Sequence, residues 1–142
     1  RYLEPNSVDF ILPSPPYWDI LLAKRSADRR RQRAYGGHKA DLGRTGDYQS
    51  FLKGLSEVFN EAHAVLKPGC ACVVVVMDLR KKNRFYPLHM DLSAALQPVG
   101  FRLEDIIVWD RRHEYNYLRP LGYPAVFRVN KVHEYLLIFT RH

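Results

Sequence analysis

The run Cys72-Val73-Val74-Val75-Val76-Met77 constrains the fold most, because it places six apolar residues in succession. A short run of this kind, rich in branched side chains, predicts a strand that is covered on both faces, as in a parallel sheet. The segment before it predicts a helix: Asp47 can cap it, and apolar residues then recur with a 3.6-residue period up to Leu66. Pro68-Gly69 predicts the end of that helix.

The remaining elements complete an α/β pattern. Residues 8–12 form a β-prone run that ends at Pro13 and predicts a buried strand followed by a stiff turn. A second helix is predicted over Leu88–Leu96, followed by strands over Leu103–Trp109 and Glu134–Phe139. The connection between these last strands is too irregular for a crossover helix, so we expect them to pair antiparallel. The predicted fold class is α/β, with parallel strands first and an antiparallel hairpin last.

Composition and charge indicate the class of partner. The chain has 142 residues, enough for one domain with its own core, and a net charge of +7 from 22 basic and 15 acidic side chains. Such an excess favours a polyanionic partner. No stretch approaches the ~20 apolar residues of a membrane span, so no membrane contact is expected. Cys70 and Cys72 are too close in sequence to bridge and do not have zinc-site spacing, so we expect a reducing compartment and no metal.

Two segments concentrate positive charge. Residues 22–46 lack hydrophobic periodicity and are expected to form a mobile basic loop. Phosphate contacts are expected from its cations, although a solvated charged surface is the alternative. Between the last two strands, basic and aromatic residues alternate, a composition suited to nucleic acid but also found in ordinary loops. The candidate contacts in the two segments are Arg25, Arg29, Arg30, Arg31, Arg33 and Lys39, and then Arg112, Tyr115 and Arg119.

The sequence Ser14-Pro15-Pro16-Tyr17 follows the first predicted strand directly. Open α/β sheets bind ligands at the carboxyl ends of their strands, so this turn lies where a ligand is expected. The two prolines stiffen the turn and lack N–H groups, which leaves backbone carbonyls to accept hydrogen bonds. Such a turn suits a substrate that donates from an amino group and presents a flat ring to Tyr17. Alternatively, Pro-Pro forms only a turn, and Tyr17 and Trp18 belong to the core.

These residues resemble the catalytic motif of S-adenosylmethionine-dependent DNA amino-methyltransferases, which reads Asp/Asn/Ser-Pro-Pro followed by an aromatic residue. The resemblance continues in family-like order through residues 58–61, residues 65–69 and the closing residues 133–139, and so spans nearly the whole chain. It implies a Rossmann-like sheet, double-stranded DNA as partner, and a prokaryotic restriction-modification role in the cytoplasm, at the nucleoid. Serine in the first motif position leans toward the N4 of cytosine over the N6 of adenine.

The resemblance also implies roles for individual residues. Ser14 and Pro15 would accept the N–H bonds of the target amine and touch the methionine end of S-adenosylmethionine, while Pro16 stiffens the turn. Tyr17 would stack on a base that has left the duplex. Trp18 is a candidate DNA contact. Asp78 ends the Val-rich strand and is a candidate cofactor ligand, or else caps the following turn.

One expected segment has no counterpart. The family binds its cofactor through a strand that ends in a Phe-x-Gly-x-Gly loop, and no segment of this sequence matches that pattern. Residues 1–142 therefore resemble the catalytic half of a circularly permuted methyltransferase. The sheet edge that would continue into the cofactor strands is expected to be bare, so we expect a homodimer or a complementing cofactor-binding chain there. The alternative function is a non-catalytic nucleic-acid-binding module.

Overall fold

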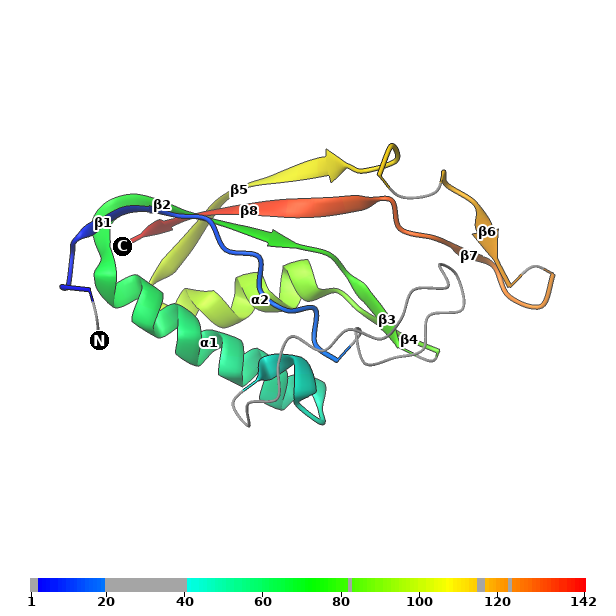
Figure 1. Cartoon of the computed structure of the whole chain (residues 1–142), viewed down its shortest axis with the longest axis horizontal. Helices are drawn as coiled ribbons and strands as arrows, with labels where there is room; N and C mark the ends of the chain where they lie inside the picture. The colour runs from blue at the N-terminus through cyan, green and yellow to red at the C-terminus, as the bar shows by residue number, and fades with distance from the viewer. Residues whose placement is uncertain (1–2, 20–40, 82, 115–116, 123) are drawn as a thin grey trace.

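The computed structural model describes residues 3–19, 41–81, 83–114, 117–122 and 124–142. One four-stranded sheet carries two helices on the same face, and two small hairpins project from one end (Figure 1). In chain order the elements are β1 (Val8–Ile11), η2 (Leu42–Arg44), α1 (Tyr48–Val65), β2 (Leu66–Val76), β3 (Leu79–Lys81), β4 (Arg84–Tyr86), α2 (Leu88–Leu96), η3 (Gln97–Val99), β5 (Phe101–Asp110), β6 (Pro120–Leu121), β7 (Arg128–Val129) and β8 (His133–Arg141).

The strand order in the main sheet is β1-β2-β8-β5. β1 runs parallel to β2, whereas β8 lies between β2 and β5 and runs antiparallel to both. β1, β2 and β5 therefore point the same way, and their carboxyl ends meet at one end of the sheet. The predicted α/β class, with a parallel pair first and an antiparallel pair last, is confirmed.

The helix α1 begins as predicted. The Asp47 side chain accepts a 2.9 Å hydrogen bond from the Ser50 N–H, and the buried stripe of the helix includes Phe51, Leu55 and Phe59. The predicted stop at Pro68-Gly69 is wrong, because α1 ends at Val65 and both residues lie within β2. Leu66 is fully buried and already extended, and it pairs with Val8 of β1, so sheet pairing ends the helix earlier.

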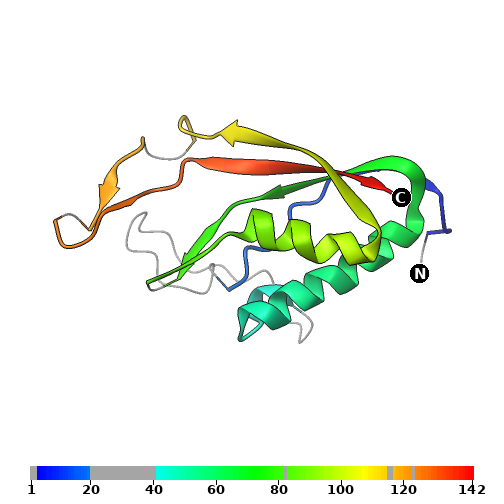
Figure 2. The same cartoon turned by 180° about the vertical axis from the view of Figure 1, so that it is seen from behind.

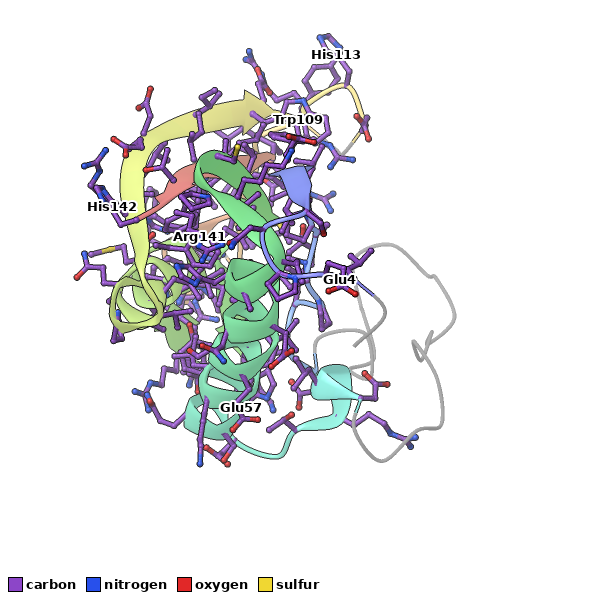
Figure 3. The ribbon with its side chains drawn as sticks, turned by 90° about the vertical axis from the view of Figure 1, so that its left-hand side faces the viewer. Glu4, Glu57, Trp109, His113, Arg141 and His142 are labelled. Carbon is purple, nitrogen blue, oxygen red and sulfur yellow. The ribbon has the colours of Figure 1, made fainter. Side chains whose placement is uncertain are left out.

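The expectation that the Val-rich strand is covered on both faces is also wrong for the described residues. Cys72, Val74 and Val76 are buried beneath the helices, whereas Val73 and Val75 on the other face are half-buried. Figure 2 shows both helices on one side of the sheet. In the end-on view of Figure 3, Trp109 and His113 lie on the side away from α1. The strand alternates because only one of its faces has a helical layer against it.

β1 is an edge strand and not the buried strand that the sequence predicts. Its residues Asp9 and Phe10 are exposed, and Asp9 forms an ion pair of 2.5 Å with Lys67 of β2. Within the described residues β1 pairs with β2 alone. One side of β1 therefore presents backbone groups that no described strand uses.

The cysteines, the helix lengths and the metal-ligating side chains bear on the remaining general expectations. Both cysteines are free thiols, as their spacing predicts. In the described ranges, no helix has the length and apolar character needed to cross a membrane. Among those same residues, no three metal-ligating side chains gather into a cluster.

Candidate functional site

The predicted catalytic turn lies at the carboxyl end of β1, as its position after the strand requires. The Pro13 carbonyl accepts a 3.0 Å hydrogen bond from the Val75 N–H, which anchors the start of the turn to β2. Ser14 is exposed, and Pro15 and Pro16 are half-buried. Among the described residues, none forms a hydrogen bond with the Ser14 hydroxyl or the Pro15 carbonyl. Both acceptors are therefore available to a ligand.

The other end of the turn is held by a buried carboxylate. The Tyr17 hydroxyl donates a 3.2 Å hydrogen bond to Oε1 of Glu134, which is only 3% exposed. The other carboxylate oxygen, Oε2, accepts a hydrogen bond of 2.5 Å from Arg111. The guanidinium of Arg111 lies 4.4 Å from the centre of the Trp109 ring and also pairs with Glu114. The turn is thus anchored at the Pro13 carbonyl and at the Tyr17 hydroxyl.

The sequence patterns do not predict the pairing of Glu134 with Arg111, which is otherwise only one of the basic residues between the last two strands. A usable signal exists, because Glu134 is the one acidic side chain in the otherwise apolar closing run of residues 134–139. Carboxylates are rarely buried unless they are paired, so a charge in such a run indicates a partner. The identity of that partner required the fold, since Arg111 lies 23 residues away in sequence.

Asp78 has a structural role in this chain. Its side chain is 4% exposed, and Oδ1 lies 2.6 Å from Nδ1 of His89 and accepts a 3.2 Å hydrogen bond from the His89 backbone N–H. His89 lies in the first turn of α2, where Pro87 at the cap position provides no side-chain hydrogen bond. Asp78 therefore satisfies a backbone donor that the helix itself leaves unpaired. The expected cofactor contact is not supported; the capping alternative fits the structure, although the capped element is a helix.

Trp18 belongs to the core, so the expected DNA contact is wrong for this residue. Its ring is 4% exposed and packs 5.4 Å from Tyr48 and 5.2 Å from Tyr86. Its indole N–H donates a 2.8 Å hydrogen bond to the Thr45 carbonyl. With 4% of its surface exposed and its indole N–H hydrogen-bonded inside the protein, the ring offers too little surface for a base to stack on. Its neighbour Asp19 forms an ion pair with Lys81 of β3.

Two of the other candidate DNA contacts, Arg112 and Arg119, lie within the described residues. Arg112 is exposed, and its Nη2 lies 2.6 Å from Asp110, a hydrogen-bonded pairing that lowers the pKa of the Asp110 carboxyl. Arg119 is exposed, and its backbone N–H donates to the Asn130 side chain at 2.6 Å. Neither side chain bonds to the turn. The remaining candidates lie outside the described residues: Arg25, Arg29, Arg30, Arg31, Arg33, Lys39 and Tyr115. Of the predicted basic loop, the described residues 41–46 contain the short helix η2.

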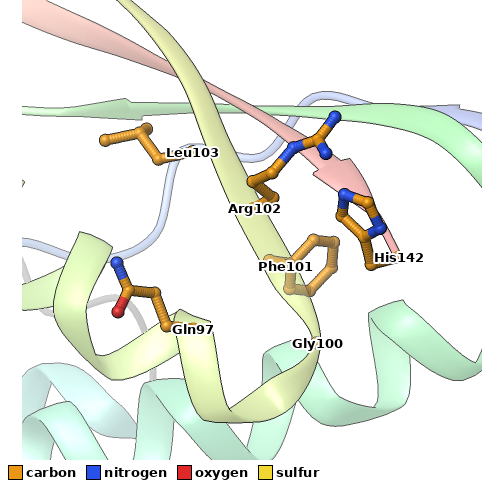
Figure 4. A pocket seen from close by; sticks show the side chains of 6 residues that line it. All are labelled: Gln97, Gly100, Phe101, Arg102, Leu103 and His142. Atoms are coloured by element: carbon orange, nitrogen blue, oxygen red, sulfur yellow. The ribbon is translucent and has the colours of Figure 1, made fainter.

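Two hollows of the described residues are large enough to consider for a nucleoside cofactor. One, of about 450 Å³, lies between Gln97 and His142 at the opposite end of the sheet, where β5 begins and β8 ends (Figure 4). The other, of about 510 Å³, adjoins the turn and is lined by Trp18, Lys81, Asn83, Arg84 and Tyr86. Neither hollow, as lined by described residues, has the carboxylate expected of a site for the nucleoside part of S-adenosylmethionine.

Comparison with known proteins gives consistent results. The chain is 33% identical over 114 residues to the type II methyltransferase M.MwoI of Methanothermobacter wolfeii, a match that covers 77% of this chain and 15% of that protein. The chain therefore spans a small part of the length of that relative.

Two solved structures of similar fold are named as DNA methylases or methyltransferases. TTHA0409 of Thermus thermophilus, named as a DNA modification methylase and solved with S-adenosyl-L-methionine, matches with a TM-score of 0.67 and 24% identity over 99% of this chain and 50% of its own. The cytosine-N4-specific PvuII DNA methyltransferase matches with a TM-score of 0.64 and 15% identity, over 99% of this chain and 45% of its own. These likenesses confirm the Rossmann-like methyltransferase fold. The family model for N6/N4 DNA methylases matches residues 8–142, and the chain belongs to this S-adenosylmethionine-dependent DNA methylase family.

Proposed function

We propose that this chain is the catalytic half of a methyltransferase that methylates an exocyclic amine of a DNA base. The observation that carries the proposal is the turn Ser14–Tyr17, which is anchored to β2 through Pro13 and to β8 through the Tyr17 hydroxyl. Between the two anchors, the Ser14 hydroxyl and the Pro15 carbonyl are left without partners among the described residues. A rigid pair of acceptors beside an aromatic ring suits an amino group on a flat base.

The chemistry follows from the weakness of the nucleophile. The lone pair of an exocyclic amine is delocalised into the ring, so the nitrogen must be oriented and polarised before it can attack. Ser14 Oγ and the Pro15 carbonyl accept hydrogen bonds from its two N–H groups. Tyr17 holds the base by stacking, a contact of roughly 1–3 kcal/mol per base. S-adenosylmethionine, when bound, supplies the electrophilic methyl group. Fixing the amine in line with that group accounts for much of the acceleration, because positioning alone is worth about 7–11 kcal/mol.

The favoured target is the N4 of cytosine, with the N6 of adenine as the alternative. The support is Ser14 in the first motif position, which resembles the cytosine-directed form of the motif. Mass spectrometry of nucleosides from methylated DNA separates the two targets directly. N4-methylcytosine supports the proposal, whereas N6-methyladenine as the sole product contradicts the choice of base.

We also propose where the cofactor-binding part of the enzyme docks. The chain covers 45% to 50% of the two structures described above, so about half of their length has no counterpart here. Phe10 and Ile107 lie on the sheet face opposite the helices and are 54% and 47% exposed. The unpaired edge of β1 and this exposed apolar face suit contact with the cofactor-binding half better than exposure to water. Sedimentation of the purified chain tests this proposal, because a homodimer would show that the same edge pairs with a second copy of the chain.

The test compares two serine substitutions on either side of β1. In the protein that carries both halves, Ser14→Ala should lower methyl transfer from tritiated S-adenosylmethionine by about 100-fold or more, as loss of a positioned hydrogen bond does. DNA affinity should change less than about threefold, because the hydroxyl acts on the reacting amine. Ser7→Ala is the matched control, since Ser7 is exposed at the far end of β1 and its hydroxyl donates to the Glu4 carbonyl. Equal losses of affinity and rate in Ser14→Ala would contradict the assigned role, and DNA binding by the wild type without any transfer would favour the non-catalytic module.

A further inference from the structure

Five cations lie on the β3–β4 hairpin and on the segment around β7 beside it. Arg80 and Lys131 lie on the face of the hairpin that carries Phe85, and Lys81 and Arg84 lie on its opposite face. Arg128 of β7 donates a 3.0 Å hydrogen bond to Asn83 at the tip of the hairpin, and Lys131 lies with its Nζ 5.1 Å from the centre of the Phe85 ring. Figure 1 shows β3, β4 and β7 at the same end of the molecule, beyond the carboxyl ends of β1 and β2. We call this the basic hairpin surface; its cations are Arg80, Lys81, Arg84, Arg128 and Lys131.

Most of these charges are not neutralised within the described part of the chain. Lys81 pairs with Asp19, but Arg80, Arg84, Arg128 and Lys131 have no described carboxylate within ion-pair distance. The Cζ of Arg80 lies 5.4 Å from the same Phe85 ring that Lys131 contacts, so two like charges share one ring. Gathering cations in this way costs free energy in the isolated chain, and an anionic ligand would offset that cost.

Lys131 shows the effect of this crowding most clearly. Burial lowers its pKa, the nearby positive charge of Arg80 lowers it further, and the buried carboxylate of Asp78 opposes the shift. An ammonium group in this position gains from an added negative charge more than a fully solvated one does, because less water screens it.

The basic hairpin surface adjoins the turn that would receive the base. Trp18 directly follows Tyr17, and its ring contacts Tyr86 of β4 at 5.2 Å and the Nζ of Lys81 at 4.0 Å. The hollow of about 510 Å³ next to the turn is lined in part by Lys81 and Arg84. A nucleotide flipped toward Tyr17 brings its own and neighbouring phosphates to this end of the sheet.

We infer that the basic hairpin surface binds the DNA backbone phosphates that flank the flipped base. The inference rests on the proposed function and adds a surface that the catalytic turn does not include. Arginine and lysine side chains that contact phosphates fix the position of a protein on the duplex without reading its sequence. The contribution of this surface should therefore be electrostatic, sequence-independent and sensitive to salt.

The experiment is a salt titration of DNA binding by the chain, with a fluorescent duplex and anisotropy as the signal. The double substitution Arg80→Gln and Arg84→Gln removes two exposed cations and leaves the core untouched. The control, Lys53→Gln and Arg102→Gln, removes the same charge from α1 and from the start of β5, away from the turn. Each lost phosphate contact should reduce the slope of log K against log salt by about 0.9, so the hairpin variant should lose about 1.8 and bind roughly tenfold more weakly at low salt.

The possible outcomes separate this inference from the proposed function. If the wild type binds DNA and the hairpin variant keeps the slope and affinity of the control, the inference is wrong and the proposed function stands. If the wild type does not bind DNA at any salt concentration, the proposed function fails and the inference fails with it. An unchanged thermal unfolding midpoint in the hairpin variant shows that any loss of binding reflects lost contacts.

Discussion

Replacing Glu134 by Gln should destabilise the chain by about 2–3 kcal/mol, the value expected for a buried hydrogen bond to a charged group. The carboxylate is 3% exposed and accepts hydrogen bonds from Arg111 and Tyr17. Glutamine keeps the size of the side chain but removes the charge opposite Arg111, which is itself 16% exposed. Removing one partner of a fully buried pair costs about 3–5 kcal/mol, and the smaller value applies because Glu114 and the Trp109 ring remain beside the guanidinium.

Urea unfolding followed by circular dichroism measures this difference. For a chain of this size the loss corresponds to a fall in the thermal midpoint of roughly 6–10 °C. Asp110→Asn is the control, because it breaks an ion pair with Arg112 whose partners are 50% and 58% exposed. Exposed pairs of this kind contribute little, so the control midpoint should stay at the wild-type value. If Glu134→Gln is as stable as Asp110→Asn, the buried carboxylate does not hold this end of the sheet together.

Three further predictions concern the core. Burial raises the pKa of the Cys72 thiol to about 12, so Ellman's reagent at pH 8 should modify half-buried Cys70 first and Cys72 only on unfolding; equal rates would contradict this. Burial and the nearby charge of Arg141 lower the pKa of His63, so the folded chain is most stable while His63 is neutral. This contribution to the free energy of unfolding is complete above the unfolded-state pKa of about 6.5 and is lost as the pH falls through the folded-state pKa. The urea midpoints at pH 7.5 and pH 5.5 should therefore differ less in His63→Gln than in the wild type. An equal fall in midpoint between the two pH values in both proteins would refute the role of His63. Gly100→Ala should cost about 1–3 kcal/mol in thermal unfolding, because φ is +107° and the new Cβ would lie 2.6 Å from His63 Nε2; an unchanged midpoint would show that the loop adapts.

Local patterns predicted the regular elements well. The helix over Leu88–Leu96 has the predicted bounds, and α1 begins at the predicted cap, because both depend on neighbours within a few residues. The motif at Ser14–Tyr17 was located correctly at a strand end for the same reason. The hairpin β3–β4 is not predicted from the sequence, since strands of three residues show too little periodicity to detect.

Long-range contacts determined what the sequence could not predict. Trp18 follows the motif and resembles a binding residue, yet its place in the core depends on Tyr48 and Tyr86, which lie 30 and 68 residues further along the chain. Asp78 is similar: its role depends on His89, which α2 brings to the end of β2. Among the described residues only one face of the Val-rich strand is covered by helices, which the sequence did not predict, because an apolar run does not reveal which segment covers each face.

The position of β8 between β2 and β5 bears on the order in which the chain can fold during synthesis. Among the described strands, β5 has no hydrogen-bonded neighbour in the sheet except β8, which follows it in the chain and leaves the ribosome later. Until residues 133–141 emerge, β5 has no neighbouring strand with which it pairs in the folded sheet. Pairing of β5 with β2 in the absence of β8 would be a kinetic trap. Pulse-proteolysis of stalled nascent chains should therefore show protection of β5 appearing together with protection of β8, in a single late step.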